Sequence, residues 1–184
     1  MNRIVSSVVA GAAGLAVLLP SSGVAHAATT YKTLAGPGFT SQYPSTFQTG
    51  SLTGKATFHD ADAALFPTLV GVQSPDGTVS VLIGSRAGHD STSRASTIEK
   101  TAFTDLPPGY KRQGSVQQST KKIGSSSYLI SGDTLVSSKE SLARFVYSTM
   151  LGKRTFYFFL TATSKATVAE QQGIGYVVGA TRAA

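Results

Sequence analysis

The chain has 184 residues, with 16 Lys and Arg against nine Asp and Glu, so its formal net charge at pH 7 is +7. It contains no cysteine, which excludes disulfides, thiol catalysis, thiolate metal sites and a lipid-bearing N-terminal cysteine. The positive charge would attract anionic polymers or lipid headgroups, but it also keeps a protein in solution, so charge alone does not identify a partner.

Residues 1–27 are typical of a secretory signal peptide. Arg3 supplies positive charge, a mainly apolar segment follows, and Ala25-His26-Ala27 forms a small-residue cleavage site. The apolar segment is shorter than the ~20 residues that a membrane span requires, and no later apolar run reaches that length. We expect cleavage after Ala27 and a secreted product; an uncleaved membrane anchor is the alternative. Residues 28–37 are expected to be a loose lead-in to a single domain over residues 38–184.

The segment GFTSQYPSTFQ (Gly38–Gln48) predicts the first strand of that domain. Apolar or small residues alternate with polar ones over Phe39–Tyr43. Pro44 cannot donate a hydrogen bond to a strand ladder, so it ends the strand and begins a turn. Phe47 can then fold back onto the core. Because this interpretation accounts for the whole segment, we favour it over an aromatic ligand-binding element.

A hairpin is predicted next. Thr68–Ser74 and residues 78–86 both have strand character, and Pro75-Asp76-Gly77 between them has the composition of a tight turn. Alternating apolar residues in the second segment support the assignment.

The spacing of apolar residues then changes to that of a helix, which we expect within residues 90–109. Asp90 or Ser91 caps its start, and Pro107-Pro108-Gly109 ends it. Its apolar stripe consists of Ala95, Ile98, Ala102 and Leu106, with Phe103 beside it.

The following segments predict antiparallel strands. Residues 110–124 are polar and alternating, as in an edge pair of strands, and residues 125–132 form a short strand. Residues 141–150 and 154–163 are the strongest strands, and Leu151-Gly152-Lys153 joins them tightly. Aromatic residues on both faces of the last strand indicate that both faces are covered, so it should lie centrally.

Residues 164–182 return to helical spacing, with Ser164 as the candidate cap. Gly173 and Gly175 each cost a helix about 1 kcal/mol, but they allow close packing on a sheet. The order of elements predicts an α+β domain, with an antiparallel sheet of about six strands flanked by helices.

Two stretches resemble the PsbP-like fold family. GFTSQYPSTF resembles the family's opening strand, with Phe47 in place of the usual Trp, and residues 141–178 are similar to its closing strand, turn, aromatic strand and helix. The exported, actinobacterial LpqN-like branch is also similar, although its members usually carry a lipid-bearing cysteine. The resemblance implies a PsbP-like sandwich and a binding or accessory role without catalysis; it names no partner.

The densest group of candidate metal ligands is His59, Asp60 and Asp62, which His89-Asp90 could join. Neither set has the i, i+4 spacing that aims two ligands at one ion, so a solvated loop is the preferred interpretation.

A serine hydrolase that uses His59 or His89 is the alternative enzyme. The sequence has no G-x-S-x-G elbow and no visible pairing of nucleophile and base. Glu99 and Glu140 each adjoin a lysine and are expected to be solvated charges. Because a phosphate-binding glycine loop is also missing, we expect no catalytic residue, metal or cofactor.

Three basic pairs fall at predicted strand ends or turns and could form one cationic patch: Lys111, Arg112, Lys121, Lys122, Lys153 and Arg154. Such a patch would bind an anionic envelope component or an acidic protein. Nucleic acid is not expected, because no stacking aromatic residues interleave with these cations. The simpler interpretation is that they are polar turn residues, which discourage sheet-to-sheet aggregation.

The leading hypothesis is a secreted, non-enzymatic binding or accessory protein with an unidentified partner. The alternatives are a secreted serine hydrolase and a protein held on the envelope surface by charge.

Overall fold

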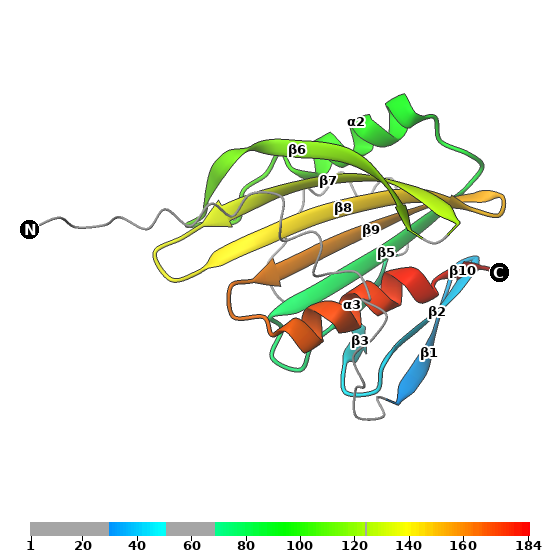
Figure 1. Ribbon diagram of the computed structural model, residues 1–184, viewed down its shortest axis with the longest axis horizontal. Helices are drawn as coiled ribbons and strands as arrows, with labels where there is room; N and C mark the ends of the chain where they lie inside the picture. Colours follow the sequence, from blue (N-terminus) through cyan, green and yellow to red (C-terminus); the bar gives the residue numbers. More distant parts are fainter. Residues whose placement is uncertain (1–29, 51–68, 124) are drawn as a thin grey trace, which may run out of the picture.

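Two antiparallel sheets and two helices make up the described part of the chain, residues 30–50, 69–123 and 125–184 of the computed structural model (Figure 1). In spatial order, the large sheet contains β3 (Gln48–Gly50), β4 (Val70–Gln73), β5 (Val79–Ala87), β9 (Arg154–Thr163), β8 (Ser141–Leu151), β7 (Ser126–Val136) and β6 (Lys111–Ile123). The small sheet contains β1 (Tyr31–Gly36), β2 (Phe39–Pro44) and β10 (Arg182–Ala183). The predicted α+β class is confirmed, with one strand more in the main sheet than expected.

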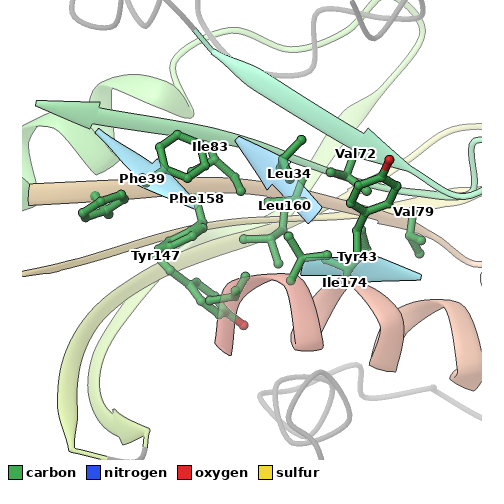
Figure 2. Packing of buried hydrophobic residues seen from close by; sticks show 14 of the residues in the cluster. Leu34, Phe39, Tyr43, Val72, Val79, Ile83, Tyr147, Phe158, Leu160 and Ile174 are labelled. Atoms are coloured by element: carbon green, nitrogen blue, oxygen red, sulfur yellow. The ribbon is translucent and has the colours of Figure 1, made fainter. Parts of the chain in front are cut away.

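The strand β9 lies between β5 and β8, as its two aromatic faces predicted. Phe156, Phe158 and Leu160 pack in a core beneath helix α3 (Val168–Ala180). Tyr157 and Phe159, on the other face, pack in a second core beneath helix α2 (Thr92–Ala102). The two helices therefore cover opposite faces of the sheet, and Figure 2 shows the first core beside α3.

The predicted first strand is confirmed as β2, which ends at Pro44, and Phe47 is buried. Residues 28–37 are not a loose lead-in throughout, because Tyr31–Gly36 forms β1 and pairs with β2 along its length. The apolar alternation that marks a strand is weak there, since Leu34 is the one residue of β1 that is fully buried. Residues 1–27 lie outside the described residues.

The hairpin β4–β5 is confirmed, with its turn at the predicted Pro-Asp-Gly sequence. The side chain of Ser74 donates to Oδ1 of Asp76 at 2.7 Å, and the backbone N–H of Thr78 donates to the same oxygen at 3.1 Å. Gly77 has a φ of 71°, which is the left-handed conformation that glycine adopts without strain. The turn is therefore fixed by local chemistry, as predicted.

The helix α2 starts where expected but ends one turn early. Ser91 caps it by accepting a hydrogen bond from the N–H of Arg94 at 3.2 Å. Phe103 leaves the helix and is buried, with the guanidinium of Arg144 5.2 Å from its ring centroid. Leu106 consequently lies outside the helix, and 42% of it is exposed. The burial of Phe103, rather than the following prolines, sets the end of the helix.

Residues 110–124 do not form an edge pair of strands. Lys111–Ile123 is one long strand, β6, which among the described residues pairs with β7 alone, and the register shifts between Gln113 and Gln117. β7 is correspondingly longer than the predicted short strand, because it pairs with β6 on one side and β8 on the other.

The helix α3 begins at Thr167 rather than at the predicted cap Ser164. Thr167 and Glu170 form a capping box, in which the N–H of Glu170 donates to Thr167 Oγ1 at 3.3 Å and the N–H of Thr167 donates to Glu170 Oε2 at 2.8 Å. Gly173 faces Phe47, so the predicted close packing of this helix is found at Gly173.

Gly173 and Gly179 offer a matched pair of substitutions within α3. A Cβ at Gly173 would lie 2.9 Å from Cζ of Phe47, whereas a Cβ at Gly179 would have no described atom within 4 Å. We expect Gly173→Ala to lower the free energy of unfolding by about 1–3 kcal/mol through overpacking. Gly179→Ala should raise it by up to about 1 kcal/mol, because alanine favours helix. Urea denaturation measures both, and an equal gain in the two variants would show that α3 does not pack tightly on Phe47.

Candidate functional groove

A groove opens where the C-terminal end of α3 and the small sheet face the adjoining ends of β6 and β7. Its volume is about 810 Å³. Its walls include Gln42, Ile123, Ser126, Tyr128, Tyr176 and Arg182. These residues come from β2, β6, β7, α3 and β10, so the groove is assembled from segments far apart in the sequence (Figure 1).

One wall of the groove is fixed by interactions of Tyr176. Its ring stacks on that of Tyr31 with centroids 4.1 Å apart, and its hydroxyl donates to Oε1 of Gln42 at 2.9 Å. These contacts tie α3 to β1 and β2, and they hold Tyr176 and Gln42 in place before any ligand arrives. A preformed concave site with a few placed polar groups is the usual form of a small-molecule site.

Tyr128 lies on the large-sheet side of the groove. Its ring is buried against Tyr147 and Phe158, with both centroid distances at 6.5 Å. Burial raises the pKa of its hydroxyl, and the positive charge of Arg182 opposes that rise. Within the described part of the chain, the hydroxyl has no hydrogen-bond partner, so it is available to a ligand.

Arg182 is the cation that lines the groove among the described residues. Its Nη1 donates to the carbonyl oxygens of Gly179 and Thr181, at 2.7 and 2.8 Å. These two bonds orient the guanidinium on a strand that pairs with β2. Nε and Nη2 have no protein acceptor among residues that the structure describes, so the three N–H groups on these two nitrogens remain for a ligand.

The six cations predicted to form one patch are divided between the two ends of the sheet. Lys111–Arg112 begins β6 and Lys121–Lys122 closes it, and an extended strand separates the pairs by about 30 Å. Lys153–Arg154 lies at the β8–β9 turn, at the same end as Lys121–Lys122. Four of the six therefore share the end of the sheet where the groove lies.

Two of these arginines are held by the protein itself. Nε of Arg112 donates to Oδ2 of Asp133 at 2.9 Å, and its Nη2 donates to the carbonyl of Phe103. Nη2 of Arg154 donates to the hydroxyl of Ser85 at 3.1 Å. Lys111, Lys122 and Lys153 are exposed, whereas Lys121 is half-buried like the two arginines.

Glu99 was predicted to be a solvated charge, and this prediction is wrong. The side chain is buried between α2 and the sheet, where it accepts hydrogen bonds from Ser131 Oγ at 2.5 Å and Ser148 Oγ at 2.6 Å. Burial raises the pKa of Glu99 to about 7, although the serine hydroxyls oppose the rise. Glu99 follows Ala95 by four residues and precedes Ala102 by three, so the helical stripe contained the signal for its burial.

Glu140 is not freely solvated either. It accepts a hydrogen bond from the hydroxyl of Tyr110 at 2.6 Å and lies 3.6 Å from Nζ of Lys165. Its side chain is 15% exposed, so the carboxylate helps to fasten the turn between β7 and β8.

The candidate catalytic and metal residues are only partly described. His59, Asp60 and Asp62 lie outside the described residues. Nε2 of His89 lies 3.2 Å from the carbonyl oxygen of Gly152, and Asp90 accepts a hydrogen bond from Tyr157 at 2.8 Å. Over residues 30–50, 69–123 and 125–184, no three His, Asp or Glu side chains gather in a way that could hold a metal ion.

In the same described ranges, neither helix combines the length and the apolar character needed to cross a bilayer.

No family model and no curated protein sequence matches the chain. Among solved structures, it is similar to cyanobacterial PsbP (CyanoP) from Synechocystis sp. PCC 6803, with a TM-score of 0.53 and 10% identity over 90% of this chain and 99% of that one. A structure from Bacteroides thetaiotaomicron VPI-5482 gives a TM-score of 0.54 and 16% identity over 83% of this chain and 48% of that one. The chain thus spans about half the length of the Bacteroides structure.

These likenesses define the class of the fold. The chain has a PsbP-like α+β fold, as its opening and closing sequence patterns predicted. A fold does not determine a function, so the role of the protein is argued from the groove.

Proposed function

We propose that the protein is an exported binding protein without catalytic activity, and that the groove holds its ligand. The groove is the observation that carries this proposal. Its volume of about 810 Å³ suits a small-molecule site. One wall is fixed by Tyr176, while Tyr128 and Arg182 keep free donors. Such preorganisation lowers the entropic cost of binding.

Export is part of the proposal and rests on the signal-peptide pattern of residues 1–27. The finer resemblance to LpqN-like exported proteins belongs to it as well. Mass spectrometry of protein collected from the culture medium should give a chain that starts at Ala28. Retention of the full chain in the membrane fraction would contradict export.

A hydrolase finds less support from the geometry. A serine nucleophile requires a histidine within hydrogen-bond reach of its hydroxyl. The described histidine, His89, instead contacts the carbonyl oxygen of Gly152. His59 lies outside the described residues, so the informative variant replaces both histidines; any hydrolytic activity that survived it would not depend on them.

Site-specific photo-crosslinking tests the groove as the binding site. A photoreactive residue at Ser126, inside the groove, is compared with one at Lys139, an exposed residue at the opposite end of the sheet. After export from the producing cells, we expect one defined adduct from position 126 and none from position 139. Equal labelling at both positions, or none at position 126, would argue against the groove.

A further inference from the structure

The distribution of charge around the groove is one-sided. Five cations lie at its end of the sheet: Lys121, Lys122, Lys153, Arg154 and Arg182. None of the seven acidic residues that the structure describes lines it. Two of these acids are already paired, since Asp133 binds Arg144 and Asp90 lies within 4 Å of Arg86 and Arg94.

Five of these acidic residues are far from the groove in the topology, whereas Asp90 lies at the same end of the sheet but on its α2 face, where it accepts a hydrogen bond from Tyr157. Glu99 and Asp133 point to the α2 face, whereas the groove lies on the α3 side of the sheet. Asp76 lies in the β4–β5 turn and Glu140 near the β7–β8 turn, both at the other end of the sheet. Glu170 is in the first turn of α3, and the groove is at its last. The potential in the groove is therefore positive, which favours an anion.

Among the cations near the groove, Arg182 is the one that lines it and can contact a bound anion directly. A guanidinium with three uncommitted N–H groups, one on Nε and two on Nη2, suits a carboxylate or a phosphate, both of which accept paired hydrogen bonds from arginine. The carbonyls of Gly179 and Thr181 already orient this group, so little side-chain entropy is lost when an anion binds.

The rest of the lining combines apolar residues, Ile123, Leu151 and Ala180 among them, with groups that suit hydroxyls. Its polar part contains the side chains of Thr33, Thr40, Gln42, Ser125, Ser126 and Tyr128. Hydroxyls and an amide both donate and accept hydrogen bonds, so they match a ligand that carries many hydroxyls.

Resting on the proposed function, we propose that the groove binds a small polyhydroxylated anion, a sugar acid or a sugar phosphate. Arg182 binds the carboxylate or phosphate, and the hydroxyl-rich walls bind the sugar. Lys121, which lies opposite Tyr128 on β6, adds long-range attraction.

NMR titration of the full exported chain tests this assignment. The probes are glucuronate, glucose 6-phosphate and, as a neutral match, glucose. We expect the two anionic sugars to shift the amide signals of Ser126, Tyr128 and Arg182, and glucose to bind at least about tenfold more weakly. Added salt should weaken the anionic sugars and leave glucose unchanged. Equal binding of glucose and the anionic sugars would overturn the proposal.

The variant Arg182→Gln and its control Lys139→Gln remove the same charge from opposite ends of the molecule. Arg182→Gln should weaken the anionic sugars by about tenfold or more, because charged hydrogen bonds are lost. Lys139→Gln should change their affinity less than about twofold, because exposed distant charges are screened. Equal effects of the two variants would mean that net charge, rather than the groove, binds the anion.

An experiment with lipid vesicles distinguishes an anionic lipid headgroup from a free, dissolved anion. Cosedimentation with phosphatidylcholine vesicles that contain phosphatidylinositol, competed by glucose 6-phosphate, would place the anion on a lipid headgroup. Binding of the dissolved sugars alone would place it on a free molecule. If no sugar probe binds but crosslinking at Ser126 succeeds, the anion assignment fails and the binding function stands.

Discussion

Replacing Asp133 with Asn is expected to lower the free energy of unfolding by about 3–5 kcal/mol, the cost of leaving a buried charge without its counter-ion. Asp133 on β7 accepts hydrogen bonds from Nε and Nη2 of Arg144 on β8, at 2.9 and 2.6 Å. Both side chains are 0% exposed. Because neither can turn to water, the guanidinium of Arg144 would keep its charge while losing its ionised partner Asp133.

Arg112, which belongs to the same ion-pair cluster, provides the control substitution. Arg112 also contacts Asp133, at 2.9 Å, but its side chain is 28% exposed and can reach solvent. We expect Arg112→Gln to cost about 1 kcal/mol, as for partly exposed ion pairs. Urea denaturation at neutral pH compares the two variants. If Asp133→Asn costs no more than Arg112→Gln, the pair between Asp133 and Arg144 is not desolvated.

A double variant separates a buried-charge penalty from a packing loss. Asp133→Leu with Arg144→Met removes both charges, and well-packed apolar pairs often equal or exceed the stability of the ion pair that they replace. We expect the double variant to be more stable than Asp133→Asn. A double variant as unstable as Asp133→Asn would mean that shape, and not charge, is the source of the loss.

The strands that were predicted most accurately from the sequence are those whose own residues alternate clearly or are joined by a recognisable turn. β8 and β9 have alternating apolar and aromatic residues, and the β4–β5 turn has Pro-Asp-Gly chemistry. β1 escaped detection because Leu34 is the one fully buried residue in it, so its pairing with β2 supplies the stabilisation that its own composition lacks. Tertiary pairing, rather than local preference, determines that strand.

The buried ion pair of Asp133 and Arg144 was not predicted from the sequence, for a different reason. Asp133 and Arg144 each sit in a strand where a polar residue normally points to solvent, and their strands become neighbours only in the folded sheet. The groove has the same origin, because its lining comes from seven elements with no shared motif. The basic pairs were visible, but the strand register was needed to show which of them lie at the groove's end of the sheet.

Replacing Glu99 with Gln is expected to stabilise the protein at pH 8 by up to about 3 kcal/mol and to leave it nearly unchanged at pH 5. In the folded protein, burial raises the pKa of Glu99 from 4.5 to about 7. Each unit of difference between the folded and unfolded pKa is worth about 1.4 kcal/mol. The glutamine side chain keeps the shape and carries no charge at any of these pH values, so it avoids the cost of burying an ionised carboxylate.

The direction in which stability changes with pH follows from the number of protons that each state binds. Between pH 4.5 and about pH 7, Glu99 holds its proton in the folded state but loses it in the unfolded state. The folded state therefore binds more protons, and its stability falls as the pH rises through this window. Above the folded pKa, both states have lost the proton and the contribution is constant. Urea denaturation of wild type and Glu99→Gln across pH 5–8 isolates this single group.

Ser148→Ala is the matched control, because it keeps the carboxyl group and removes one hydroxyl that donates to it at 2.6 Å. That hydrogen bond lowers the pKa of Glu99, so its loss should raise the pKa further and extend the fall in stability to higher pH. The two variants thus move the pH dependence in opposite senses, one abolishing it and one extending it. A Glu99→Gln protein with the same pH dependence as wild type would show that the carboxyl group reaches solvent, and that α2 does not seal it against Ser131 and Ser148.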